Sequence, residues 1–160
     1  RLVSIELGMG GTAESLDAAY KQVLAARGID ISKVTIVDGS GLSRSNRMPA
    51  AVINRILAQV YADPVKHAAV RAGMPVSGKP GSLRFRFNAG EQRDALNLIE
   101  AKTGWIRTGY SLAGFIKAKD GTDLIFTVYN LGNSVSYRNR AAMDALVHGF
   151  FRCGASLSSN

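Results

Sequence analysis

The sequence has few of the side chains that bind metal ions or form disulfide bridges. Its 160 residues include two histidines and one cysteine, Cys153. A single cysteine cannot close a bridge within the chain, and it does not make a metal-ligand set with two distant histidines. We therefore expect no metal and no cofactor. We expect Cys153 to be a small buried thiol, with a bridge to a partner elsewhere as the alternative.

Long apolar runs, internal repeats and low-complexity segments are also absent from the sequence. No stretch approaches the roughly 20 apolar residues that a helix needs to cross a bilayer, so no membrane span is expected. A hydrophobic content of 46% fits a globular domain with one core.

Negative charge is the scarcer sign, with 12 acidic residues against 20 lysines and arginines. The net charge of +8 favours anionic partners, including nucleic acid or polymers with peptide carboxylates. The basic residues are scattered, however, in pairs such as Arg84 with Arg86 and Arg138 with Arg140. Because they form no basic helix and no aromatic platform, we expect no nucleic-acid binding.

Apolar periodicity predicts helices in the first part of the chain. They are expected over residues 12–27 and 49–61, with a shorter one over 65–71. β-Branched residues predict a short strand over 34–37. Strict alternation predicts an extended segment over 82–87, with its Phe side chains inward and its Arg side chains in solvent.

The second part of the chain predicts an antiparallel meander. Strands are expected around residues 97–103, 110–118 and 123–131, and an Asp-Gly turn over 119–122 joins the last two. A final helix over 138–152 is expected to cover one face of the sheet. The predicted fold class is α/β of the α+β type, an antiparallel sheet meander packed by helices.

The most informative stretch is EAKTGW at residues 100–105, at the end of the first of these strands. Lys102 offers a compact positive charge and Thr103 a directional hydroxyl donor, which together suit the capture of a carboxylate beside a backbone. Gly104 lacks a Cβ, so another backbone can approach it closely. A polar strand end is the alternative, because such a tripeptide occurs by chance in about 3% of chains of this length.

Four short segments follow one another along the chain: VDGSGLSR at 37–44, GKPGSL at 78–83, AKTG at 101–104 and SLAGF at 111–115. This order resembles the C-terminal part of the class C low-molecular-mass penicillin-binding proteins, the serine-type D-Ala-D-Ala carboxypeptidase/endopeptidase family. The resemblance spans about residues 34–151. It implies a penicillin-binding transpeptidase-like fold that lacks its N-terminal strands.

That family uses Ser-x-x-Lys, Ser-x-Asn and Lys-Thr-Gly motifs, and only the third is found here. No serine in the sequence has a lysine three positions further on. The resemblance therefore implies that residues 1–160 are the C-terminal portion of a single penicillin-binding domain, incomplete at its N-terminus, whose nucleophile lies in the N-terminal part of the same protein. Relatives often carry a small hydroxyl residue at the position of Trp105.

The resemblance also implies roles for the strand residues. Lys102 and Thr103 are expected to bind a terminal carboxylate, and the Trp105 N–H is expected to be one of two oxyanion donors. The strand, with Gly104, is expected to receive the substrate as an added strand.

The implied reaction is hydrolysis of peptidoglycan stem peptides through an acyl-enzyme, with β-lactams as acylating partners. The implied location is the cell envelope, on its periplasmic or extracellular side. The alternative is a non-catalytic module that binds peptidoglycan peptides or β-lactams and lacks the nucleophile.

Ser40 is a candidate nucleophile because glycines flank it. Its Asp-Gly-Ser-Gly context is not the Gly-x-Ser-x-Gly elbow of serine hydrolases. The sequence suggests no Asp–His pair, since His67 and His148 look like ordinary helix residues. We expect the loop around Ser40 to be structural.

Overall fold

The structure is a computed structural model that describes residues 2–158. These described residues form two compact units, which divide between Ile56 and Leu57. The first unit contains α1 (Leu2–Glu6), α2 (Ala13–Ala25) and the start of α3 (Ala50–Ala62). The second unit contains the end of α3, then α4 (Ala68–Ala72), η1 (Gly90–Ala95), β1 (Ile99–Ile106), β2 (Gly109–Lys117), β3 (Asp123–Leu131), α5 (Tyr137–Cys153) and η2 (Gly154–Ser158).

Helix α2 begins at a cap, because the Thr12 hydroxyl accepts a hydrogen bond from the Ser15 N–H at 3.1 Å. Its apolar face packs against the segment that follows it and against the first turn of α3. The core of the first unit consists of Leu16, Leu24, Ile29, Val34, Ile36 and Val52.

The prediction of a strand over 34–37 is wrong, because this segment forms only an isolated bridge at Thr35. The backbone donors of this segment are satisfied by side chains instead. The Ile36 N–H donates to the Asp17 carboxylate at 2.7 Å, and the next two N–H groups donate to the Asn46 amide oxygen at 2.8 and 3.2 Å. With its donors already paired, the segment needs no neighbouring strand.

The predicted meander is confirmed. Within residues 2–158 the sheet has three strands in the order β1-β2-β3, each antiparallel to the next. Strand β1 extends to Ile106, beyond the predicted end at 103. The Asp-Gly turn between β2 and β3 is also present, and Gly121 adopts the positive φ of +87° that such a turn requires.

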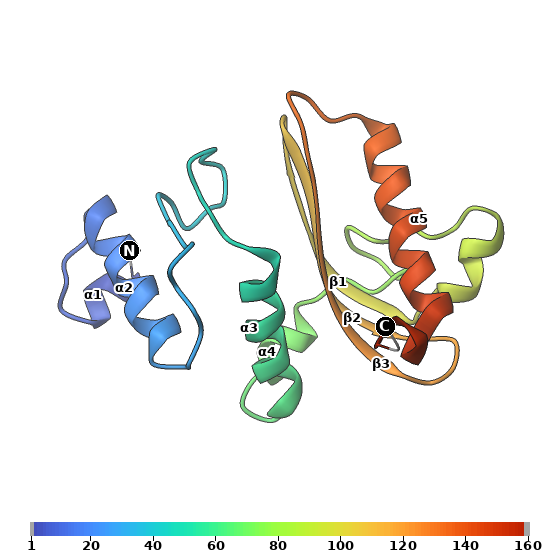
Figure 1. The fold of residues 1–160 in the computed structure, drawn as a ribbon, viewed down its shortest axis with the longest axis horizontal. Coiled ribbons are helices and arrows are strands. Elements are labelled where there is room, and N and C mark those ends of the chain that lie inside the picture. The colour runs from blue at the N-terminus through green and yellow to red at the C-terminus, as the bar shows by residue number, and fades with distance from the viewer. Residues whose placement is uncertain (1, 159–160) are drawn as a thin grey trace. The chain divides into compact units, whose positions relative to one another are not determined.

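Helix α5 lies along one face of the sheet, as predicted (Figure 1). It buries Met143, Val147 and Phe151, which are spaced four residues apart and pack against the sheet core. Cys153 is exposed, so the prediction of a buried thiol is wrong. The reason is helical phase, because a residue two positions after Phe151 points away from the buried face.

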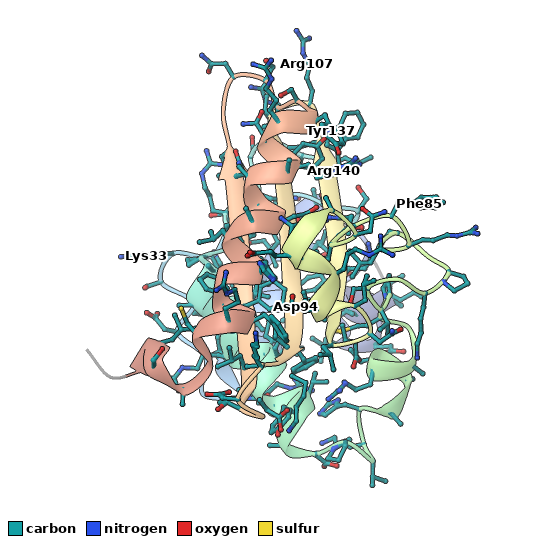
Figure 2. All side chains as sticks on the ribbon, turned by 90° about the vertical axis from the view of Figure 1, so that its right-hand side faces the viewer. Lys33, Phe85, Asp94, Arg107, Tyr137 and Arg140 are labelled. Carbon is teal, nitrogen blue, oxygen red and sulfur yellow. The ribbon has the colours of Figure 1, made fainter. Side chains whose placement is uncertain are left out.

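The segment over 82–87 is not extended, and this prediction is also wrong. Its N–H groups at Arg84 and Arg86 donate three residues back, at 3.1 Å each, so the chain forms successive turns. Phe87 is buried with a φ of +56°, whereas Phe85 is 75% exposed and points away from the sheet (Figure 2). Burial therefore recurs every three to four residues, and one arginine lies inside.

That arginine, Arg86, forms a buried ion pair with Asp144 of α5. Its Nε donates to Asp144 Oδ1 at 2.8 Å, and its Nη2 donates to the same oxygen. Both side chains are about nine-tenths buried. Because removing one partner leaves a charge unpaired in the interior, the pair fixes the loop over 82–87 to helix α5.

We predict that Asp144→Ala lowers the free energy of unfolding by about 3–5 kcal/mol, because the Arg86 guanidinium loses its buried partner. Replacing both residues with apolar ones, Arg86→Met with Asp144→Leu, should cost less than Asp144→Ala alone. Urea denaturation of the natural protein and of both variants measures these free energies of unfolding.

The control for this prediction is Lys117→Ala, which removes the exposed 3.1 Å pair between Lys117 and Asp123. Such an exposed pair is worth at most about 1 kcal/mol. If Asp144→Ala costs no more than Lys117→Ala, the buried pair is not an anchor of the loop.

Candidate functional site

Within residues 2–158, strand β1 is one of the two edge strands of the sheet, and its outer edge is only half covered. The Ile99 carbonyl accepts from the Ser77 N–H, and the Ala101 N–H donates to the Pro75 carbonyl, both at 2.9 Å. Because every second residue of a strand directs its N–H and C=O to the same edge, the backbone groups of Thr103 and Trp105 also point outward. No backbone segment within residues 2–158 hydrogen-bonds to these two residues from that side.

The Lys102 side chain is exposed and lies at this open edge. Its Nζ donates to the outward Thr103 carbonyl at 2.7 Å. Within the described residues Lys102 forms no ion pair with a carboxylate. The ammonium is therefore available to an anion that arrives at the edge.

Glu100 is the acidic residue nearest to Lys102 on the same face of β1, and it is already paired. The Arg71 guanidinium donates from Nε and Nη2 to its two carboxylate oxygens, at 2.8 Å each. Arg71 also lies over the Phe115 ring at 4.3 Å, beside a pocket of about 290 Å³. The hydrogen bonds that Arg71 donates to Glu100 raise the pKa of Arg71. Since both oxygens of the Glu100 carboxylate accept hydrogen bonds from Arg71, Glu100 does not compete with an incoming anion for Lys102.

The Thr103 hydroxyl lies on the opposite face of β1 from the Lys102 stem. Its Oγ1 is 3.0 Å from the Ser82 hydroxyl, which comes from the GKPGSL turn. Sequence reasoning missed Ser82 as a site residue, because the expected extended segment gave no reason to place it against β1. The order of the four motifs was the one available signal, since it already included this turn.

Gly104 faces Ser111 across the β1–β2 pair, and a Cβ at Gly104 would collide with the Ser111 hydroxyl. Within residues 2–158 a close backbone approach occurs at Gly114 of β2, while the approach expected at Gly104 stays a prediction. A Cβ at Gly114 would meet the Glu100 carbonyl and lie 2.6 Å from the Ala101 Cα. Gly114 thus lets β2 pack directly against the strand that carries Lys102.

The Trp105 N–H points to the open edge, and the residue as a whole is 63% exposed. The indole packs against its cross-strand neighbour Tyr110, with the two ring centroids 6.5 Å apart. Lys102, Thr103 and the Trp105 N–H thus lie at the open half of β1, with Ser82 beside Thr103. Their role as a binding site stays a prediction.

The model of the D-Ala-D-Ala carboxypeptidase 3 (S13) family matches residues 1–149. The chain belongs to this family. The resemblance inferred from the four motifs is thereby confirmed.

Two curated members of the family illustrate the extent of the match. Carboxypeptidase DacB of Mycolicibacterium smegmatis is 31% identical over 157 residues, covering 96% of this chain and 34% of that protein. A D-alanyl-D-alanine carboxypeptidase of Actinomadura sp. is 30% identical over 136 residues, covering 81% and 24%. The chain spans about a third or less of the length of these curated relatives.

Solved structures show the same fold. Penicillin-binding protein 4 of Haemophilus influenzae, solved with a β-lactam, matches with a TM-score of 0.81 and 21% identity, over 95% of this chain and 37% of that one. A predatory endopeptidase of Bdellovibrio bacteriovorus, solved with an immunity protein, matches with a TM-score of 0.60 and 20% identity, over 83% and 35%. The predicted fold class, a part of the penicillin-binding fold, is confirmed.

Two further observations concern the described residues as a whole. Between residues 2 and 158 no helix has the length and apolar character needed to cross a bilayer. Over the same residues, no group of three His, Cys, Asp or Glu side chains is arranged to hold a metal ion.

An Asp–His pair that the sequence did not suggest is present beside α5. His148 Nε2 lies 2.8 Å from Asp94 Oδ1, and His148 is largely buried against the Phe151 ring. Asp94 belongs to η1 and lies next to the helix (Figure 2). The pair joins η1 to α5 and contributes no group to the edge of β1.

The family's DGSGLSR segment forms a loop around the Asp38 carboxylate in the first unit. Asp38 accepts from the Asn46 amide at 2.8 Å, from the Gly41 N–H at 2.9 Å and from the Ser43 N–H at 2.8 Å. The Ser40 hydroxyl also donates to this carboxylate, at 3.1 Å. Because Asp38 also accepts three other hydrogen bonds and its pKa is lowered, this carboxylate is a weak base toward Ser40, which fits a structural loop.

We predict that this loop loosens in acid. The Asn46 amide, together with the N–H donors, lowers the pKa of Asp38. The charged form is favoured in the folded loop, so its contribution is complete above the ordinary value of 3.8 and is lost as the pH falls through the lowered pKa. The protection of the Gly41 and Ser43 amides from hydrogen exchange, relative to unstructured amides at the same pH, should fall over that range.

Asp38→Asn should give fast exchange at these two amides at all pH values, because an amide side chain cannot accept all of these bonds. Asp30→Asn, which affects a local turn at Ser32, is the matched control. Equal protection in the Asp38→Asn and wild-type proteins would show that the carboxylate does not hold the loop.

Proposed function

We propose that this chain supplies the carboxylate-binding edge strand of a serine-type D-Ala-D-Ala carboxypeptidase or endopeptidase that acts on peptidoglycan stem peptides. The observation that carries the proposal is the unpaired Lys102 ammonium at the open half of β1, beside the outward Trp105 N–H. Membership of the D-Ala-D-Ala carboxypeptidase 3 family supplies the reaction class.

The edge of β1 suits a short extended peptide. A peptide that adds itself as a strand exchanges main-chain hydrogen bonds with Trp105, whose N–H and C=O both face outward. The Thr103 carbonyl, which holds the Lys102 ammonium, is the neighbouring group on the same edge. A terminal carboxylate and a scissile carbonyl that lie one residue apart, as in D-Ala-D-Ala, can therefore reach both groups at once.

The proposed reaction is acyl transfer to a serine. Its hydroxyl attacks the scissile carbonyl, and the oxyanion accepts hydrogen bonds from the Trp105 N–H and from the N–H of the nucleophile itself. The terminal D-alanine then leaves, and water hydrolyses the acyl-enzyme. We propose that a Ser-x-x-Lys motif in the N-terminal part of the same protein carries this serine, because these 160 residues contain no such motif.

β-Lactams should acylate the same serine, since their carboxylate and reactive carbonyl imitate the end of the stem peptide. A β-lactam complex of penicillin-binding protein 4, which shares this fold, supports the proposal. Such a protein works where its substrate lies, in the cell envelope on the periplasmic or extracellular side.

We predict that Lys102→Ala lowers the acylation efficiency of the complete natural protein by roughly 10- to 150-fold, because a hydrogen bond to a charged group is lost. Lys102→Arg should also lose activity, since a planar guanidinium has a different reach and shape from an ammonium. Thr103→Ser should be milder, because the hydroxyl remains. Acylation rates with a fluorescent penicillin measure these effects.

Lys117→Ala is the matched control for this prediction, because Lys117 is also an exposed strand lysine but lies at the far end of β2. It should acylate at the wild-type rate. A wild-type rate for Lys102→Ala would overturn the site assignment. A wild-type protein that binds the fluorescent penicillin reversibly, and is never covalently labelled, would instead identify a non-catalytic binding module.

A further inference from the structure

The contact between Ser82 and Thr103 joins two exposed or half-exposed hydroxyl groups at the open edge of β1. Their oxygens lie 3.0 Å apart, within hydrogen-bond distance. In such a pair one hydroxyl donates to the other, and the proton of the second hydroxyl stays free. The pair therefore always has one donor to offer, whichever way the internal bond runs.

We propose that Ser82 belongs to the carboxylate-binding site and forms with Thr103 a two-hydroxyl group that donates one hydrogen bond to the substrate's terminal carboxylate. This inference rests on the proposed function and extends it to a residue outside the Lys-Thr-Gly motif. Lys102 supplies the charge, while the two hydroxyls supply direction.

Ser82 is held in place by its neighbours on the loop. Leu83 is fully buried and Phe87 almost so, and Arg86 is fixed to α5 by Asp144. Gly81, immediately before Ser82, has a φ of +131°, which other residues rarely adopt. The loop therefore fixes the position of the Ser82 backbone while leaving its hydroxyl exposed.

The Ser82 hydroxyl has no competing role in the fold. Within residues 2–158, Ser82 Oγ has the Thr103 hydroxyl as its hydrogen-bond partner. Ser77, on the same loop, shows the contrast, because its hydroxyl is fully buried and donates to the Ala95 carbonyl at 3.0 Å. Ser77 holds the loop together, and Ser82 faces outward toward the edge of β1.

The test is a double-mutant cycle on the complete natural protein, with a peptide ending in D-Ala-D-Ala as substrate and kcat/KM as the readout. Ser82→Ala should lower kcat/KM by roughly 3- to 10-fold, the range for one modest hydrogen bond. In the Thr103→Val background, Ser82→Ala should cause little further loss, because the pair no longer exists. Ser82→Thr should restore most of the activity, since it keeps the hydroxyl.

Ser156→Ala is the matched control, because Ser156 is also an exposed serine whose hydroxyl makes one local bond, to the Cys153 carbonyl at 2.6 Å. It should leave kcat/KM unchanged. A merely structural role for Ser82 predicts equal losses in both backgrounds, and that result would overturn the inference. So would a wild-type rate for Ser82→Ala.

Failure of the proposed function looks different from failure of this inference. If the wild-type protein neither cleaves the peptide nor reacts with penicillin, the proposed function and the role of Ser82 fall together. If the wild-type protein is active and sensitive to Lys102→Ala but insensitive to Ser82→Ala, the proposed function stands and the inference is overturned.

Discussion

The architecture of the second unit depends on the position at which β1 stops pairing with a neighbouring segment along its outer edge. The Pro75–Ser77 segment pairs with the strand as far as Ala101 and then turns away. An open sheet edge exposes unpaired N–H and C=O groups and invites association with other chains. Here the open half is short and carries the Lys102 ammonium, so the charge that we propose for binding a substrate carboxylate also discourages pairing with another strand.

The surroundings of this edge keep Lys102 available. On one face of β1, Arg71 pairs with Glu100. On the other face, the loop over 82–87 lies against Thr103 through Ser82. Gly114 brings β2 close behind the strand. The departure from the family pattern at Trp105 changes a side chain, but the outward N–H belongs to the backbone and is unaffected by it.

The parts of the fold that the sequence predicted are those set by neighbouring residues. An Asp-Gly turn between two largely apolar runs specifies a hairpin locally, so the meander could be predicted directly. The edge position of Lys102 followed from the family resemblance. The two failures that concern the backbone, over 34–37 and 82–87, involve distant partners. The backbone of the segment before Asp38 is satisfied by Asp17, and Arg86 is buried because Asp144, 58 residues away, receives it.

Ser82 escaped prediction for the same reason. Its contact with Thr103 spans 21 residues and exists only because the loop folds into successive turns. Alternation of Phe and Arg indicated an extended segment. No pattern among the neighbouring residues indicated that Arg86 pairs with a buried carboxylate, Asp144. Strand propensity describes the local backbone, whereas the ion pair between Arg86 and Asp144 determines which side chains of the loop are buried.

The buried pair between Arg86 and Asp144 also limits how such a sequence can change by descent. A substitution at either position alone strands a charge in the interior and loosens the loop in the same step. Exchanges there must come nearly together, whereas the exposed Arg84 and Phe85 of the same loop are free to drift. Among homologous sequences, these two distant positions should therefore vary jointly or remain as they are.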